Sequence, residues 1–270
     1  IRRKICISLV SGLAKIMLIK HLFWSENMSK RIEMFKERYG GERCFIIGNG
    51  PSLRMEDLDV LAYNKEYSFG ANRIYVSFND TVWRPTFYCI QDGTMIKEYH
   101  KEIEKLDLKY KFISDYALEK LGDKSFKTAY MFHLNPHRYY PYYPGFSDDI
   151  AQEISEGFTV TYAEIQIAAY MGFKEIYLLG VDFNYSKILD SSGKIVETGS
   201  KDYFSDRYIL ANEKRNIPQL HNSLQAYKKA EVYSKRNGFR IFNATRGGKL
   251  EVFERVNFDM LFPLEGDGEI

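Results

Sequence analysis

The 270-residue chain lacks several features that mark common protein classes. It has only three cysteines, Cys6, Cys44 and Cys89, and their spacing fits no metal-ligand motif. We therefore expect free thiols in a reducing, cytosolic environment. Lysine and arginine total 38 while aspartate and glutamate total 36, so the net charge of +2 gives no reason to expect nucleic acid as a partner.

An uninterrupted hydrophobic run long enough to span a membrane is also missing. The apolar stretch at residues 5–24 contains two lysines and a histidine, so it falls short of the roughly 18 consecutive apolar residues of a spanning helix. We predict a helical extension over residues 1–40. Within it, residues 1–24 either make peripheral contact with a membrane surface or pack against protein, and the sequence favours neither alternative.

Neither a G-x-G-x-x-G motif nor a P-loop occurs. The sequence has instead a short apolar run, residues 44–47, that stops at Gly48-Asn49-Gly50-Pro51-Ser52. Glycines let a backbone approach a ligand closely, and the Pro-Ser pair suits the start of a helix. A strand that enters a helix N-terminus through such a turn is typical of phosphate and nucleotide sites. A tight βα turn without a ligand is the alternative.

Apolar runs and amphipathic segments alternate along the chain, which predicts an α/β, Rossmann-like fold with a mostly parallel sheet and helices on both faces. After the first strand, we expect strands at residues 67–70, 86–90, 110–114, 174–179 and 240–243. We expect helices at residues 55–61, 95–106, 162–171 and 223–237, the last one capped by Ser223. The nucleotide-binding catalytic domain would then cover residues 41–262, with a long polar lid at 184–218 and a tail at 263–270.

Polar residues stand where three of the predicted strands end, at Asn49, at Asn72, and at Gln91 and Asp92. The carboxyl ends of parallel strands share one edge of a sheet, and ligands bind at that edge in open α/β folds. We expect these side chains to gather there as nucleotide-binding residues. Asn and Asp also favour turns, which is the alternative explanation for each of them taken singly.

A second polar cluster is predicted at the same edge. Thr159 and Thr161 stand at the N-terminus of a strongly predicted helix, and Asp182 follows the next strand. Asp182 would bind a ribose hydroxyl, position a loop or cap a turn, and the sequence leaves these three roles open.

Two histidines, His133 and His137, have the four-residue spacing of metal ligands on a helix. Pro136 lies between them and is incompatible with a helix interior. We therefore expect an ordered aromatic loop near the ligand edge and no metal site.

Two stretches resemble known nucleotide-edge motifs. Residues 47–53 and 172–183 are similar to motifs of the bacterial sialyltransferases of glycosyltransferase family 42. They are equally similar to the broader MptE-like family, which includes 6-hydroxymethylpterin pyrophosphokinases and motility accessory factors implicated in flagellin glycosylation with nonulosonic acids. Residues 243–253 resemble the tail of the MptE-like family. The resemblance covers roughly residues 43–262.

The resemblance implies roles for individual residues. His221 stands just before the last long helix, where the sialyltransferases have their general base. The nucleotide-binding positions of that family correspond here to Gly48, Asn49, Gly50, Ser52 and Asn72. The family's Ser-Gly contact at the central helix is replaced by Val160-Thr161. Of the two tyrosines that hold the leaving phosphate, Tyr185 supplies one. Pro218 stands in the place of the other, so Tyr203 or Tyr208 of the lid would substitute.

The function that these comparisons imply is an inverting glycosyltransferase of the sialyltransferase type. It would move an acidic sugar from a CMP-activated donor to a glycan acceptor in surface polysaccharide synthesis, with no metal or cofactor required. The alternative is a Mg-ATP-dependent pyrophosphokinase, in which Asp92 and Asp182 hold Mg²⁺. A nucleotide-binding protein without catalysis is the third interpretation.

Partners and location follow from the leading interpretation. We expect a nucleotide-sugar donor and a glycan acceptor as partners, and a homo-oligomer is an open alternative to a monomer. The expected location is cytoplasmic, at the inner face of the cell membrane if residues 1–24 bind lipid.

Overall fold

A computed structural model describes residues 28–121, 126, 128–136, 143–189, 192–209 and 216–262. The strands of the main sheet are, in chain order, β1 (Arg43–Ile47), β2 (Tyr67–Ala71), β3 (Phe87–Ile90), β4 (Tyr110–Ser114), β5 (Tyr130–Phe132), β8 (Glu175–Leu179), β11 (Arg240–Asn243) and β12 (Glu254–Arg255). Two small sheets pair β6 (Leu134–Asn135) with β7 (Ile154–Ser155), and β9 (Lys187–Leu189) with β10 (Ile195–Glu197).

The helices follow the strands along the chain. The α-helices are α2 (Met55–Tyr63), α3 (Gly93–Lys105), α4 (Tyr116–Leu121), α5 (Val160–Tyr170) and α6 (Leu220–Asn237). The 3-10 helices are η3 (Asn72–Asn79), η5 (Asp206–Tyr208) and η6 (Phe258–Leu261).

Over the described residues, the main sheet has eight strands in the order β12-β11-β8-β1-β2-β3-β4-β5, and each pairing in it is parallel. The chain starts in the middle at β1, builds outward to β5, and then returns to the other side of β1 with β8. The predicted α/β, Rossmann-like fold is therefore confirmed. The order of the strands reverses between β1 and β8, which is where open sheets of this kind bind ligands.

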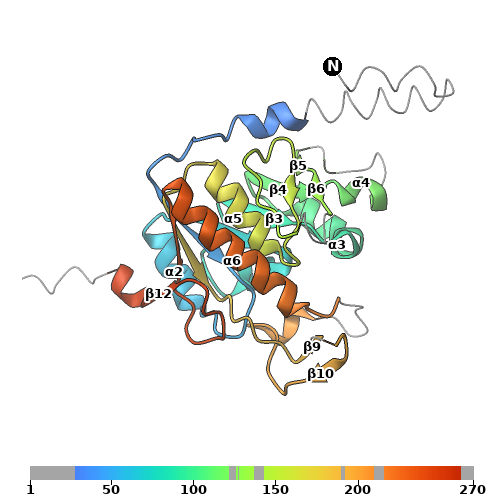
Figure 1. Ribbon diagram of the computed structural model, residues 1–270, viewed down its shortest axis with the longest axis vertical. Helices are drawn as coiled ribbons and strands as arrows, with labels where there is room; N and C mark the ends of the chain where they lie inside the picture. The colour runs from blue at the N-terminus through green and yellow to red at the C-terminus, as the bar shows by residue number, and fades with distance from the viewer. Residues whose placement is uncertain are drawn as a thin grey trace, which may run out of the picture.

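Helices cover both faces of the sheet because side chains on each strand alternate between them. On β1, Cys44 and Ile46 join the core beneath α5 and α6, whereas Phe45 and Ile47 join the core against α2 and α3. Figure 1 shows α5 and α6 side by side across one face, with α2 and α3 toward the two sides of the sheet.

The described part of the N-terminal extension packs onto this body. Residues 28–33 are helical, and Ile32 and Phe35 are fully buried. The Phe35 ring makes edge contacts with Tyr110 and Tyr130. The prediction for residues 1–24, and the tail at 263–270, lie outside the described residues. No helix in the described ranges is long and apolar enough to cross a membrane.

The predicted start of α2 at Met55 is confirmed, but Pro51 and Ser52 lie in the preceding turn, and the cap position is taken by Arg54 without a side-chain bond. The predicted start of α6 is wrong. α6 begins three residues before Ser223, at Leu220, so Ser223 is an interior residue and not the cap. In both places, a good capping residue lies close to the true start, and backbone contacts in the folded chain decide the boundary.

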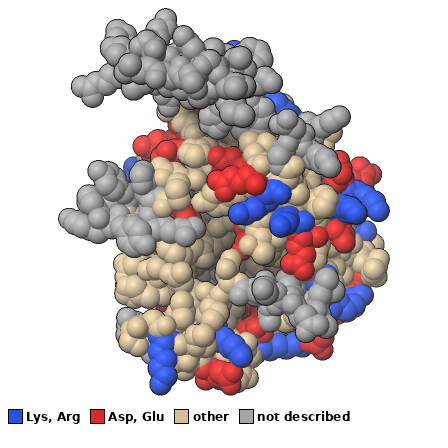
Figure 2. All heavy atoms as spheres, turned by 90° about the vertical axis from the view of Figure 1, so that its right-hand side faces the viewer, with Lys and Arg blue, Asp and Glu red and all other residues tan. Residues whose placement is uncertain are grey.

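The lid (residues 184–218) has more structure than its sequence predicts. Its described part contains the antiparallel β9–β10 hairpin and the 3-10 turn η5. On the face seen in Figure 2, lysine and arginine side chains alternate with aspartate and glutamate and form no large patch of one sign.

Candidate active site

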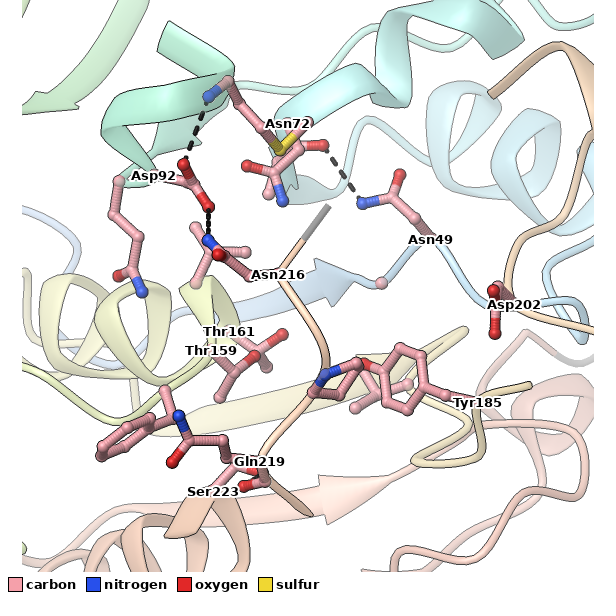
Figure 3. Close-up of a pocket in the computed structure, with 18 of the residues that line it drawn as sticks. Asn49, Asn72, Asp92, Thr159, Thr161, Tyr185, Asp202, Asn216, Gln219 and Ser223 are labelled. Carbon is pink, nitrogen blue, oxygen red and sulfur yellow. Dashed lines mark hydrogen bonds between the residues drawn. The ribbon is translucent and has the colours of Figure 1, made fainter. Parts of the chain in front are cut away.

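A cavity of about 970 Å³ lies at the carboxyl ends of β1, β2, β3 and β8, opposite the N-terminus of α5. Ten of the sequence-predicted nucleotide-binding residues line it: Gly48, Asn49, Gly50, Asn72, Gln91, Asp92, Thr159, Thr161, Asp182 and Tyr185. In Figure 3, Asn49, Asn72 and Asp92 lie along one side of the cavity, and Thr159 and Thr161 lie on the opposite side.

The floor of the cavity (residues 48–52 and 180–182) joins the glycine motif to the end of β8. The N–H of Gly48 donates to the Leu179 carbonyl at 2.7 Å, and the N–H of Gly50 donates to the Gly180 carbonyl at 2.9 Å. A Cβ atom on Gly50 would lie 2.0 Å from the Asp182 carboxylate. The glycines therefore allow two loops to touch, and the N–H groups of Gly48 and Gly50 are used within the protein and are not available to a ligand.

Asp182 is the residue that holds this floor together. Its Oδ2 atom accepts hydrogen bonds from the Ser52 hydroxyl at 2.8 Å and from the Ser52 N–H at 3.3 Å. Burial raises the pKa of the Asp182 carboxyl, an effect that the bonds from Ser52 oppose. Of the three roles considered for Asp182, positioning a loop is the one with contacts in the structure. Ser52 does not line the cavity, and its hydrogen bonds to Asp182 hold the two loops of the floor together.

Three buried amide oxygens that line the cavity have no hydrogen-bond donor among the described residues. They belong to Asn49, Asn72 and Gln91, at the ends of β1, β2 and β3. The Asn49 amide nitrogen donates to the Ala71 carbonyl at 3.2 Å, which turns its oxygen away from that bond (Figure 3). A buried acceptor without a donor is costly, so these oxygens are positioned to receive N–H or O–H groups of a ligand.

The backbone of Asn72 is strained at this point. Its φ angle is +53°, a left-handed conformation that is uncommon outside glycine although asparagine adopts it more readily than other residues, and the Tyr88 phenol donates to its carbonyl at 2.7 Å. Such strain costs about 1–3 kcal/mol and is concentrated at functional sites.

The N-terminus of α5 faces the cavity with hydroxyl groups around it. Thr159 is the N-cap residue, and its side chain makes no capping bond to the helix. The hydroxyls of Thr159 and Thr161 instead contact the Tyr227 phenol of α6. The first-turn N–H groups of a helix lack carbonyl partners within it, and the helix dipole favours an anion there. This end of α5 is therefore the natural place for a phosphate.

Asp92 and Asp202 each accept hydrogen bonds from the protein. Asp92 caps α3 through the Thr94 N–H at 2.7 Å, and its other oxygen accepts from the Asn216 amide at 2.8 Å (Figure 3). Asp202 accepts from the Ser186 hydroxyl at 2.8 Å. Within the described ranges, no three His, Cys, Asp or Glu side chains are grouped so that they could hold a metal ion. His137 lies outside those ranges.

The lid contributes tyrosines and is docked at one end. Tyr185, Tyr203 and Tyr208 line the cavity, and the Tyr203 and Tyr208 rings stack at 4.0 Å. The Tyr208 phenol accepts the Arg73 N–H at 3.3 Å, and its carbonyl accepts the Arg73 guanidinium. The Phe204 N–H donates to the Asn49 carbonyl at 3.1 Å. Burial raises the pKa of Tyr185 and Tyr208, which keeps both phenols protonated as donors.

The family model described as 6-hydroxymethylpterin diphosphokinase MptE-like matches residues 16–187, which is more than half of the chain. The chain belongs to the MptE-like family. No curated protein matches this MptE-like chain.

A solved structure shares the fold of the MptE-like chain. It is the MAf glycosyltransferase from Magnetospirillum magneticum AMB-1, with a TM-score of 0.51, 16% sequence identity and coverage of 87% of this chain. The MptE-like chain spans only 38% of the length of that protein. At this identity the likeness establishes a glycosyltransferase-like fold and nothing finer.

The sequence of the MptE-like chain did not predict how α6 is oriented at the cavity. His221 is the second residue of α6, is exposed, and is not among the cavity-lining residues. From the same helix, Leu220, Ser223 and Tyr227 do line the cavity. Ser223 and Tyr227 are four residues apart and so share a face of the helix, but the sequence does not reveal which face meets the site.

Glu156 was also missed by sequence reasoning. It lies just before α5, is 7% exposed and lines the cavity. Its position in an irregular turn gives no periodic signal, and a glutamate in such a turn would ordinarily be assigned to the surface.

Proposed function

We propose that this protein is a glycosyltransferase that moves an acidic sugar from a CMP-activated donor to a hydroxyl group of a glycan acceptor. The observation that carries the proposal is the set of three buried amide oxygens of Asn49, Asn72 and Gln91 that have no donor. Ribose hydroxyls and the cytosine amino group are donors that would satisfy them.

The opposite wall supports the phosphate end of such a ligand. The N-terminus of α5 suits an anion, and the hydroxyls of Thr161 and Tyr185 lie on the same cavity. The leaving group of a CMP-sugar is a phosphate monoester, whose charge these donors would stabilise as the bond to the sugar breaks. A single displacement by the acceptor oxygen inverts the anomeric centre.

The role of His221 as general base stays a prediction that only the resemblance implies. An exposed imidazole at the first turn of α6 is close in sequence to the cavity-lining Leu220 and Ser223. Action in surface polysaccharide synthesis at the inner face of the membrane is part of the proposal, and the glycosyltransferase fold is what supports it.

The description of the family favours a second function, a Mg-ATP-dependent pyrophosphokinase. Its metal would be bound by Asp92 and Asp182, as the positions of these residues at strand ends suggest. Asp92 caps α3 and accepts from Asn216, and Asp182 accepts from Ser52. Both carboxylates would have to exchange these bonds for the metal, so we place this function second.

A thermal-shift comparison of CMP, CDP, UMP and ATP, each with and without Mg²⁺, tests the proposal. A ligand that binds only the folded state raises the melting temperature according to its affinity. We expect CMP and CDP to raise it without metal, and the Asn49→Leu variant to lose that shift. Asn64→Leu, at an exposed amide on the C-cap of α2, should keep it.

Turnover is measured as release of free nucleotide from a panel of CMP-, UDP- and GDP-activated sugars. Release from a CMP-sugar supports the glycosyltransferase. A shift with ATP that requires Mg²⁺, together with no release from any sugar, would replace it with the pyrophosphokinase. Binding of CMP with no release from any donor would favour the non-catalytic nucleotide-binding protein.

A further inference from the structure

Five carboxylates line the cavity, and their environments differ. They belong to Asp92, Glu119, Glu156, Asp182 and Asp202, and no histidine is among the described residues that line it. The three aspartates hold the floor, the cap of α3 and the lid, as described above. Glu119 is exposed, whereas Glu156 is 7% exposed and forms part of the wall.

The turn that contains Glu156 is fixed by a backbone hydrogen bond, by close packing and by the start of α5. The Glu156 N–H donates to the Asn135 carbonyl at 3.1 Å. The next residue, Gly157, packs so closely on Tyr162 that a Cβ atom there would lie 2.3 Å from the ring. Phe158 follows with a φ angle of +58°, and Thr159 then caps α5. A strained backbone turn of this kind persists only where the surroundings impose it.

The turn places Glu156 next to the point where the phosphate would bind. Residues 156 and 160 bracket the turn, and Val160 opens the helix whose N–H groups suit an anion. The Tyr143 phenol is close enough for the Glu156 charge to act on it, since burial and then that charge raise the pKa of Tyr143. Glu156 is largely shielded from water, and with a phosphate at the N-terminus of α5 its carboxylate would lie on the side of the cavity where the bond from that phosphate to the sugar breaks.

We propose that Glu156 is the catalytic base that accepts the proton of the attacking hydroxyl group. This inference rests on the proposed function. The acceptor oxygen forms a bond to the anomeric carbon, the bond from that carbon to the phosphate oxygen breaks, and CMP leaves with the electron pair. The proton of the acceptor hydroxyl passes to the Glu156 carboxylate.

The test uses Glu156→Gln, which keeps the size of the side chain and removes its basicity. We measure release of CMP from the CMP-sugar that the wild-type protein hydrolyses fastest, with water and with azide as nucleophiles. Water must lose a proton when it attacks, whereas azide needs no base. We expect kcat with water to fall about 10²- to 10⁴-fold, and the reaction with azide and the CMP-induced thermal shift to stay near the wild-type values.

Two further variants make the result specific. Glu153→Gln is the matched control, because Glu153 lies three residues away and does not line the cavity; it should retain wild-type kcat. His221→Ala tests the competing base, and we expect a much smaller loss of kcat than in Glu156→Gln.

Two results would overturn the assignment. One is a Glu156→Gln variant whose rates with water and azide fall together, which indicates a structural role. The other is a large loss of kcat in His221→Ala together with a small loss in Glu156→Gln. If the wild-type protein releases nucleotide from no activated sugar, the proposed function itself fails, and the assignment of Glu156 fails with it. The two failures are therefore distinguishable.

Discussion

The floor and the lid of the cavity are built in opposite ways. The floor (residues 48–52 and 180–182) consists of two loops in backbone contact, where Gly48 and Gly50 pack against Gly180 and Asp182 with no room for a side chain. The lid is docked near η5, but its β9–β10 hairpin is open to solvent, with Ile195 52% exposed.

This difference gives the two regions different roles: the floor fixes the groups that would contact a ligand, and the lid controls entry to the cavity. The floor joins two central strands and has no alternative packing, so it keeps the orphaned amide oxygens in place before a ligand arrives. The described part of the lid is docked at its η5 end, through Phe204 and Tyr208, while its hairpin is exposed, and segments with few buried contacts open at low free-energy cost. We therefore expect substitutions in the floor to affect global stability, and substitutions in the lid to affect local opening.

The largest effect is expected for Gly50→Ala. Its Cβ atom would lie 2.0 Å from the Asp182 carboxylate, and we expect unfolding free energy to fall by about 3 kcal/mol. Gly193→Ala in the lid is the matched control, because its Cβ would have nothing within 4 Å and only its φ of +80° costs about 1 kcal/mol. Urea denaturation measures both, and equal losses would contradict the comparison.

The next effect concerns the attachment of the lid. Arg73 is 7% exposed, binds the Tyr208 carbonyl and stacks over Tyr99 at 4.6 Å. We expect Arg73→Gln to weaken the docking by about 2 kcal/mol, since a buried charged hydrogen bond is lost. Proteolytic cleavage within residues 192–209, followed by mass spectrometry, should become at least tenfold faster. A lid that is cleaved at the wild-type rate would contradict this role for Arg73.

The third prediction tests whether water reaches the buried Glu164 carboxyl on α5. Glu164 on α5 is 1% exposed, neither of its carboxyl oxygens has a donor in the described part of the chain, and burial raises its pKa well above the usual 4.5. The folded state therefore keeps a proton that the unfolded chain releases above about pH 4.5. The stability that this proton confers is present below that pH and is lost as pH rises toward the raised pKa.

The measurement compares wild type with Glu164→Gln, which has no proton to lose. Relative to the variant, the wild-type unfolding free energy should fall steadily as the pH rises above 4.5, because only the unfolded wild-type chain loses the Glu164 proton there. Subtraction removes other titrations, such as that of His133, whose pKa is raised by its bond to Asp115. Parallel pH profiles for the two proteins would show that the Glu164 carboxyl is hydrated.

The smallest effects are expected at exposed ion pairs of the lid. Arg207 pairs with Asp80, and Lys187 pairs with Glu197 across the hairpin. Their side chains are largely in solvent, so Arg207→Gln and Lys187→Gln should each change the unfolding free energy by no more than about 0.5 kcal/mol. A loss of 2 kcal/mol in either variant would mean that this part of the lid is packed more firmly than its exposure indicates.

The elements that the sequence predicted well are those that local pattern determines. The bounds of β4 and β11 agree with prediction because an apolar run in each is bounded by polar residues. Asn49, Asn72 and Gln91 were predicted to meet because parallel strands end at the same edge, and all three line the cavity.

What the sequence could not predict depends on contacts between distant segments. The N–H groups of Gly48 and Gly50 bond to the end of β8, which only the pairing of β1 with β8 reveals. The place of Glu156 in the cavity wall depends on a turn without periodicity. The exposure of His221 depends on a helix start three residues earlier than its capping signal suggests.

The position of β1 at the centre of the sheet has a consequence for how the protein folds. Ser52 and Asp182, which close the floor, are 130 positions apart in the sequence, and β1 gains its second neighbour only when β8 has been synthesised. Closing so long a loop is slow, and contacts of this kind form late in folding. On the ribosome, β1 to β5 would emerge as a sheet in which β1 is still an edge strand, awaiting β8. If the proposed nucleotide site is correct, binding of the nucleotide would report that the whole sheet is complete.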